Sequence, residues 1–185
     1  MKETGCTVTI HMVSSLDGII AKKDNSVSWF DTTDNYEKGT SAPDIAEFSN
    51  SVDCYVMGSK TYEHAMDLSK NYGWPYGDIP TIVLSNRELQ IDRKNIEVYA
   101  GELGKLVEER LKPNYSKVWV VGGAMLCKEF LRQKLVNEIR MVVLPIILGE
   151  GLLFFDQVGV EQTLHVKDIT AYKNGMVELW YEINK

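Results

Sequence analysis

The chain has 185 residues, of which 44% are hydrophobic and 25% are charged, and its formal net charge is −6. This composition is typical of a globular protein, and the length suits a single domain spanning residues 1–185. The negative charge and the lack of a Lys/Arg cluster argue against non-specific nucleic-acid binding, and no apolar run reaches the roughly 20 residues that a membrane span needs.

The cysteines predict a reducing compartment, and the histidines predict that there is no metal site. Cys6, Cys54 and Cys127 lie far apart in apolar segments, which indicates buried thiols in a reducing compartment and not a disulfide framework. The first residues lead directly into a strand pattern, so we expect no signal peptide and a cytoplasmic protein. The histidines are widely separated and lack clustered cysteine or acidic partners, so we expect no metal site.

Apolar, β-branched runs predict strands along most of the chain. The predicted strands are residues 7–14, 19–21, 52–57, 81–85, 96–99, 118–121, 138–148, 163–172 and 176–183. Turn signals at residues 15–18 and 173–175 separate neighbouring strands, and Pro145 suggests that strand 138–148 lies at an edge or carries a bulge.

Helices are predicted between several of these strands. They begin near residue 43, cover residues 62–68 and 103–111, and follow the strand that ends at residue 121. Alternating strands and helices give way to a strand pair at the end of the chain. We therefore predict an α/β fold with a mixed, mostly parallel sheet of about eight strands flanked by helices, and a C-terminal antiparallel hairpin.

The junction at Gly122-Gly123 carries the strongest functional signal. A buried strand passes through two glycines into a helix, which leaves the first N–H groups of that helix bare and suited to a phosphate or pyrophosphate. A Cβ on Gly123 is expected to block such a ligand and to disfavour the backbone conformation there. Alternatively, the two glycines serve only close packing of the helix on the sheet.

A second strand–glycine–helix junction occurs at residues 58–61, with the sequence Gly-Ser-Lys-Thr. It is a second candidate phosphate site at a helix N-terminus. The alternative is that Ser59 simply caps the helix.

Four segments, taken in order and spacing, resemble the dihydrofolate reductase superfamily and, within it, the RibD C-terminal domain, the reductase domain of bacterial riboflavin biosynthesis. They are residues 15–21, 57–63, 82–85 and 120–124. The segment 144–151, with Phe154 after it, looks like the riboflavin reductases more than the folate enzymes. The resemblance covers nearly the whole chain and implies a dihydrofolate reductase-like fold.

The resemblance implies NADPH as cofactor and a set of residues that bind it. In the family the pair matching Gly122-Gly123 is held cis beside the nicotinamide ribose and the pyrophosphate. The implied cofactor-binding residues are Val13, Ile20, Gly58, Ser59, Lys60, Thr61, Ser85, Arg87, Gly122, Gly123, Ala124, Met125 and Leu126.

One position departs from the family pattern. Ser59 stands where the family usually has an arginine that contacts the adenosine 2′-phosphate. Lys60, Ser85 and Arg87 remain as candidate partners of that phosphate, which favours NADPH over NADH. The alternative is that Lys60 and Arg87 are solvated surface charges.

Hydride addition to a C=N or C=O bond needs a proton donor or a polarising group nearby. Asp44 and Phe48 resemble the substrate-binding acid and aromatic residue of the folate enzymes, although Asp44 would equally suit a helix N-terminus. Asp17 is a second candidate acid, with a plain turn role as its alternative. Trp29 is a candidate substrate contact, although a core or lid role is the more common one for such an aromatic residue.

These residues lead to three functional hypotheses. The first is an NADPH-dependent reductase of a pteridine- or aminopyrimidine-like heterocycle, similar to 5-amino-6-(5-phosphoribosylamino)uracil reductase. The alternatives are a divergent dihydrofolate reductase and a nucleotide-binding protein without turnover. We also expect a homodimer, because the strand around Pro145 and the apolar run at residues 152–155 are more hydrophobic than a monomer surface usually is.

Overall fold

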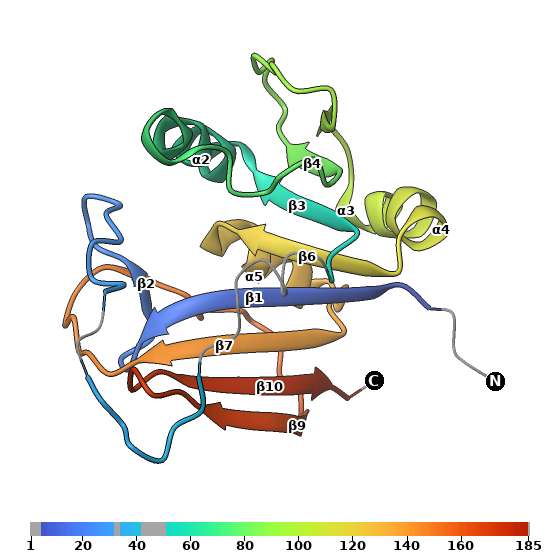
Figure 1. Ribbon diagram of the computed structural model, residues 1–185. Coiled ribbons are helices and arrows are strands. Elements are labelled where there is room, and N and C mark those ends of the chain that lie inside the picture. The colour runs from blue at the N-terminus through green and yellow to red at the C-terminus, as the bar shows by residue number, and fades with distance from the viewer. Residues whose placement is uncertain (1–4, 32–33, 42–50, 185) are drawn as a thin grey trace.

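The computed structural model describes residues 5–31, 34–41 and 51–184. An eight-stranded sheet runs through the molecule in the order β5-β4-β3-β6-β1-β7-β10-β9, and β2 and β8 form a small separate pair (Figure 1). The strands are β1 (Thr7–Ser15), β2 (Ile19–Ala21), β3 (Cys54–Gly58), β4 (Thr81–Leu84), β5 (Ile96–Tyr99), β6 (Lys117–Gly122), β7 (Glu138–Leu144), β8 (Leu152–Leu153), β9 (Leu164–Ala171) and β10 (Val177–Ile183).

Within the described ranges, three helical regions connect parallel strands. They are α2 (Ser59–Tyr72), the continuous run of α3 (Leu103–Lys105), η1 (Leu106–Leu111) and α4 (Lys112–Asn114), and α5 (Ala124–Arg132). The middle stretch, η1, is π-helical, with the N–H of Lys112 donating to the carbonyl of Val107. The helix expected to begin near residue 43 lies outside the described residues.

The strand directions confirm the mixed sheet. Six neighbouring strands, from β5 across to β7, are parallel to one another. β10 joins β7 antiparallel, and β9 pairs with β10 as the predicted C-terminal hairpin. The parallel strands therefore all end at one edge of the sheet, on the left in Figure 1.

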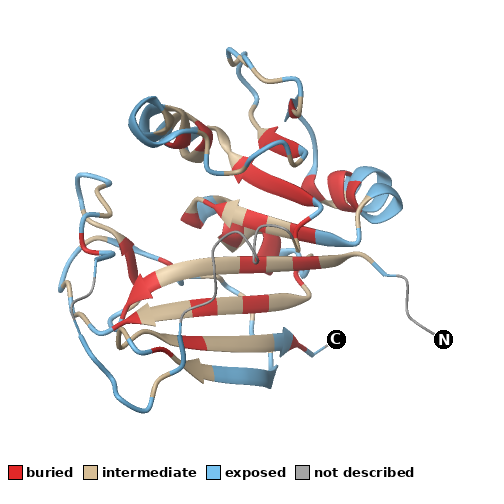
Figure 2. Cartoon of the chain, in the orientation of Figure 1, coloured by how far each residue is buried: buried red, intermediate tan, exposed pale blue. Residues whose placement is uncertain are grey.

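Around β3 and β6 the sheet is buried on both faces, which explains why its central strands read as nearly continuous apolar runs. One face of β3 and β6 packs with η1 and α5 in a cluster that includes Val56, Val120, Leu106 and Phe130. The other face packs with α2 in a second cluster around Tyr55 and its neighbours. Buried residues concentrate in β3, β6 and β1, whereas β9 is largely exposed (Figure 2).

The expectation that Pro145 marks an edge strand or a bulge is wrong. β7 lies between β1 and β10, and the edge strands of the large sheet are β5 and β9. β7 ends at Leu144, one residue before the proline. Because proline has no N–H to donate, it stops the strand instead of occupying an edge.

We predict that Phe130→Ala lowers the free energy of unfolding by about 3–5 kcal/mol, because it leaves a cavity between α5 and the sheet. Phe130 has no solvent exposure. Chemical denaturation of the variant and wild type measures the difference. Leu68→Ala on α2, where the side chain is 41% exposed, is the control and should change stability by less than about 1 kcal/mol. Equal effects of the two substitutions would contradict this account of the core.

Candidate functional site

The two glycine junctions predicted from sequence lie side by side. β3 and β6 are parallel neighbours, and Met57 pairs with Gly122 at their carboxyl ends. A Cβ built on Gly58 would lie 3.8 Å from the carbonyl oxygen of Gly122 and 3.9 Å from the nitrogen of Gly123. The N-termini of α2 and α5 therefore begin at the same place on the edge of the sheet, which is where ligands bind in open α/β sheets.

At the β6–α5 junction the backbone requires glycine at position 122. The Gly122–Gly123 peptide bond is cis, and Gly122 has a φ of +123°. A Cβ on Gly122 would also lie 3.3 Å from Cε of Met12. Gly123 has a φ of −71°, which any residue can adopt. The cis bond expected for this pair is thus confirmed, but the positive φ lies at Gly122 and not at Gly123.

Only some of the first N–H groups of α5 are available to donate to a ligand. No side chain of the described residues caps this helix. The N–H groups of Leu126 and Cys127 both donate to the carbonyl of Gly123, at 3.0 and 3.1 Å. The amide of Leu126 is therefore already engaged, and Ala124 and Met125 supply the amides that no helical carbonyl can reach. The side chain of Met125 is 84% exposed beside them.

The β3–α2 junction is also uncapped. Gly58 is the N-cap residue of α2, and no side chain donates or accepts there. Ser59 is consequently the first helical residue, and the alternative that it merely caps the helix is wrong. A Cβ on Gly123 would meet the hydroxyl oxygen of Thr61 at 3.4 Å, so Thr61 faces the other junction. Lys60 is exposed.

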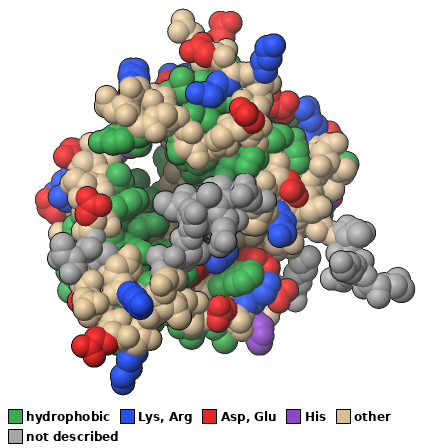
Figure 3. All heavy atoms as spheres, in the orientation of Figure 1, with side chains coloured by type: hydrophobic (Ala, Val, Ile, Leu, Met, Phe, Trp, Pro, Cys, Tyr) green, Lys and Arg blue, Asp and Glu red, His purple; other side chains and the backbone are tan. Residues whose placement is uncertain are grey.

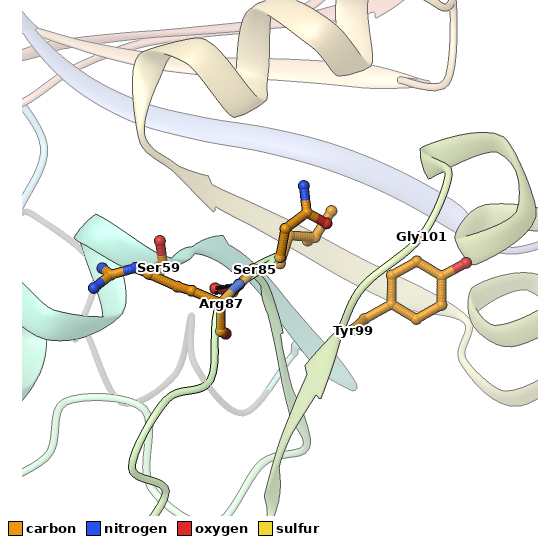
Figure 4. Close-up of a pocket in the computed structure, with 7 residues that line it drawn as sticks. Ser59, Ser85, Arg87, Tyr99 and Gly101 are labelled. Atoms are coloured by element: carbon orange, nitrogen blue, oxygen red, sulfur yellow. Dashed lines mark hydrogen bonds between the residues drawn. The ribbon is translucent and has the colours of Figure 1, made fainter.

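A pocket of about 480 Å³ lies beside α2, at the ends of β4 and β5. It brings together three of the predicted cofactor residues, with Tyr99 on the side opposite Ser59 (Figure 4). The lining residues are Ser59, Leu84, Ser85, Asn86, Arg87, Tyr99 and Gly101. Tyr99 was not predicted from sequence; its signal would have been an aromatic residue that ends a strand at the ligand edge.

Arg87 is not a freely solvated charge. Its Nη2 donates to both carboxylate oxygens of Glu63 on α2, at 2.7 and 2.6 Å. The hydroxyl of Ser85 accepts from the N–H of Arg87 and donates to its carbonyl, at 3.1 and 2.9 Å. The turn that carries Arg87 is therefore fixed against the pocket.

Asp17 joins two loops and does not suit a proton donor. Its carboxylate accepts from the hydroxyl of Ser15 at 2.5 Å and from the N–H groups of Leu148 and Gly149 at 3.1 and 2.7 Å. The hydrogen bond from Ser15, followed by those two amides, lowers the pKa of Asp17 to about 2. The side chain stays ionised at neutral pH and ties the β1–β2 turn to the segment after β7.

The remaining predicted residues lie on β1, on β2 and in the loop that follows. Val13 is half-buried in β1 opposite Val142, and Ile20 is buried in β2. Trp29 is 6% exposed, and its indole N–H finds no hydrogen-bond partner within the described ranges. A hollow flanked by hydrophobic side chains opens on this side of the molecule, between the regions of α2 and β2 (Figure 3). Asp44 and Phe48 lie outside the described residues.

A half-buried histidine on β1, His11, was missed by sequence reasoning. The ring of His11 lies 5.1 Å from that of Trp119. Burial, and then the charge of Arg140, lower the pKa of His11 to about 4. Arg140 in turn forms an ion pair of 2.5 Å with Glu178. His11 is therefore neutral at physiological pH, on the sheet face opposite α5.

Two general features accompany this site. Among residues 5–31, 34–41 and 51–184, no three or more His, Cys, Asp or Glu side chains are grouped to hold a metal ion. Over the same ranges, no helix combines the length and hydropathy of a membrane span.

Three solved structures share this fold at low sequence identity. A Shewanella sp. PV-4 protein provisionally assigned to riboflavin biosynthesis superposes with a TM-score of 0.81 at 22% identity, covering 97% of this chain and 99% of that one. The diaminohydroxyphosphoribosylaminopyrimidine deaminase/5-amino-6-(5-phosphoribosylamino)uracil reductase of Thermotoga maritima gives 0.67 at 16% identity, over 98% of this chain and 58% of that one. Enterococcus faecalis dihydrofolate reductase, complexed with NADP(H), gives 0.62 at 16%, over 97% of both chains. The fold is therefore dihydrofolate reductase-like.

Sequence similarity is more specific. The chain is 29% identical over 173 residues to the uncharacterized protein YwjB of Bacillus subtilis, an alignment that covers 93% of this chain and 95% of YwjB. The family model of the RibD C-terminal domain matches residues 6–178. Since this match spans most of the sequence, the chain belongs to the RibD C-terminal domain family, a family of reductases.

Proposed function

We propose that this protein is an NADPH-dependent reductase that transfers hydride to a pteridine- or aminopyrimidine-like heterocycle, in the manner of 5-amino-6-(5-phosphoribosylamino)uracil reductase. The observation that carries the proposal is the meeting of two uncapped helix N-termini at one sheet edge, where a Cβ built on Gly58 would lie within 4 Å of the Gly122-Gly123 backbone. Two sets of bare amides, each at the positive end of a helix dipole, favour a ligand with two linked phosphates.

The chain's own groups fit a dinucleotide in an extended pose. The amides of Ala124 and Met125, together with the first amides of α2, would hold the pyrophosphate. The pocket lined by Ser59, Arg87 and Tyr99 would take the adenosine half. Val13 and Ile20 would border the nicotinamide half, which supplies the hydride when the cofactor is bound.

The substrate would lie toward the hollow beside β2. Trp29, in the segment after β2, is kept as a candidate substrate contact, with a buried indole N–H that has no described partner. The proton that accompanies hydride transfer needs a donor with a pKa near the working pH. Asp17, with a pKa of about 2, does not meet this requirement. We keep Asp44 as the candidate acid on the resemblance alone.

We predict that NADPH binds about tenfold tighter than NADH and is oxidised in the presence of an aminopyrimidine substrate. Charge-assisted hydrogen bonds from Arg87 to the 2′-phosphate are the reason for the preference. Fluorescence titration gives the two affinities, and a screen with dihydrofolate, phosphoribosylaminouracil and simple carbonyls follows NADPH oxidation. Turnover of dihydrofolate alone would select a divergent dihydrofolate reductase, and binding without any turnover would select a non-catalytic nucleotide-binding protein.

The Gly122-Gly123 pair gives a second test. We predict that Gly123→Ala changes the free energy of unfolding by less than about 1 kcal/mol, because its φ suits alanine, but weakens NADPH binding by roughly a hundredfold. Its methyl group would stand 3.4 Å from the Thr61 hydroxyl, between the two helix N-termini, and displace the pyrophosphate from several hydrogen bonds. Calorimetric titration and a thermal melt measure the two effects.

Gly122→Ala is the matched control. Its positive φ and the close approach of Met12 predict a loss of about 1–3 kcal/mol in stability. If Gly123→Ala instead melted early and bound NADPH normally when folded, the glycine pair would serve packing and not the cofactor.

We also propose that the protein is a homodimer, on one of the two grounds taken from the sequence. The premise of an edge strand at Pro145 no longer supports it, but Leu152, Leu153 and Phe155 are 43%, 44% and 51% exposed side by side, while Phe154 is buried. Such an exposed apolar group suits a partner surface. Sedimentation at micromolar concentration should give twice the chain mass of 21.0 kDa; a species of one chain mass would refute the dimer.

A further inference from the structure

The pocket that would receive the adenosine has a carboxylate at its border. Ser59, which lines it, and Glu63 are four residues apart on α2 and so lie on the same face of the helix. Glu63 is the acid that binds Arg87. In Figure 4 the Arg87 side chain reaches from the end of β4 toward α2, as this pairing requires.

The pairing uses only part of the guanidinium. Both carboxylate oxygens of Glu63 accept from one nitrogen, Nη2 of Arg87, at 2.7 and 2.6 Å. Nε and Nη1 donate to none of the described residues. The bonds between Ser85 and the backbone of Arg87 fix the base of the side chain. Arg87 can therefore stay on Glu63 and still offer two donor groups to an anion.

The net charge offered to that anion is small. Among the described residues that line the pocket, Arg87 is the sole cation, and Ser59 occupies the position where the resemblance would place a second arginine. Glu63 compensates the charge of Arg87 and adds a like charge next to any phosphate bound there. Both side chains are about half exposed, with 57% and 45% relative exposure, so the effect is moderate and depends on salt.

We propose that Glu63 determines cofactor selectivity: by holding Arg87 and compensating its charge, it limits the preference for a nucleotide that carries a 2′-phosphate. The inference rests on the proposed function, because that proposal supplies the identity of the ligand. It assigns to Glu63 the role of a specificity-determining residue that acts through Arg87. The protein then accepts NADPH and NADH with a narrower ratio than a free arginine would give.

The test compares Glu63→Gln with wild type in titrations of NADPH, NADH, 2′,5′-ADP and 5′-ADP. Glutamine keeps the length of the side chain and an oxygen that can accept from Arg87, but removes the charge. We expect the affinities for NADPH and 2′,5′-ADP to rise roughly five- to tenfold at low salt, and those for NADH and 5′-ADP to change less than about twofold. High salt should reduce the gain.

Glu129→Gln is the matched control. Glu129 on α5 forms an ion pair of 2.7 Å with Arg132, so the substitution makes the same charge change beside an arginine, on the other face of the sheet. It should leave all four affinities unaltered. Equal gains in both variants would mean that only the overall charge matters and would overturn the role of Glu63.

Two further outcomes overturn the inference. In the first, Glu63→Gln leaves the 2′,5′-ADP to 5′-ADP ratio unchanged. In the second, the substitution weakens the binding of 2′,5′-ADP, which would make Glu63 a residue that only positions Arg87. The fragments carry no nicotinamide, so they separate this inference from the proposed reaction. A selectivity gain without any NADPH oxidation supports the role of Glu63 and contradicts the reductase.

Discussion

The parallel pairing of β3 with β6 is the interaction on which the candidate site depends. Cys54, Tyr55 and Val56 pair in step with the residues from Val118 to Val120, and the register then shifts so that Met57 lies opposite Gly122. β6 thus has one residue more than β3 at its carboxyl end, as in a β-bulge. Such irregularities change the direction of a strand and are common next to functional sites. Without this pairing the two glycine junctions would be unrelated turns.

The pairing also explains how two helices on opposite faces of the sheet can both begin at the candidate site. α2 packs with the cluster around Tyr55, and α5 with the cluster around Val56 and Phe130. Their bodies are separated by the sheet, but both helices follow parallel strands and must begin at the same edge. The burial of Phe130 therefore fixes the direction in which the first amides of α5 point, although it lies far along the helix from them.

The local parts of this architecture could be predicted from sequence, and the non-local parts could not. The strand–glycine–helix junctions and the final hairpin are each encoded within about a dozen residues, which is the range over which periodicity and turn signals act. The pairing of Arg87 with Glu63 and of Asp17 with the amides of Leu148 and Gly149 depends on the tertiary fold.

Pro145 illustrates the same limit. Proline forbids a ladder hydrogen bond, but only the position of β10 decides whether the strand before it is an edge or an interior strand. Likewise, the burial that keeps His11 neutral depends on contacts between strands distant in sequence. The electrostatics of the candidate site thus depend mainly on contacts between residues that are distant in sequence.

The two glycines of the central junction carry separate constraints, and this separation has an evolutionary consequence. Gly122 is required by its own backbone conformation in any protein that keeps the β6–α5 turn. Gly123 has no such requirement: its φ is −71°, and a Cβ there would lie in ordinary contact with the Thr61 hydroxyl, at 3.4 Å. Among relatives with this fold, a lineage that abandoned its dinucleotide would retain the first glycine and let the second drift to alanine or serine. The residue at the second position would then serve as a sequence marker that separates active reductases from descendants recruited to other tasks.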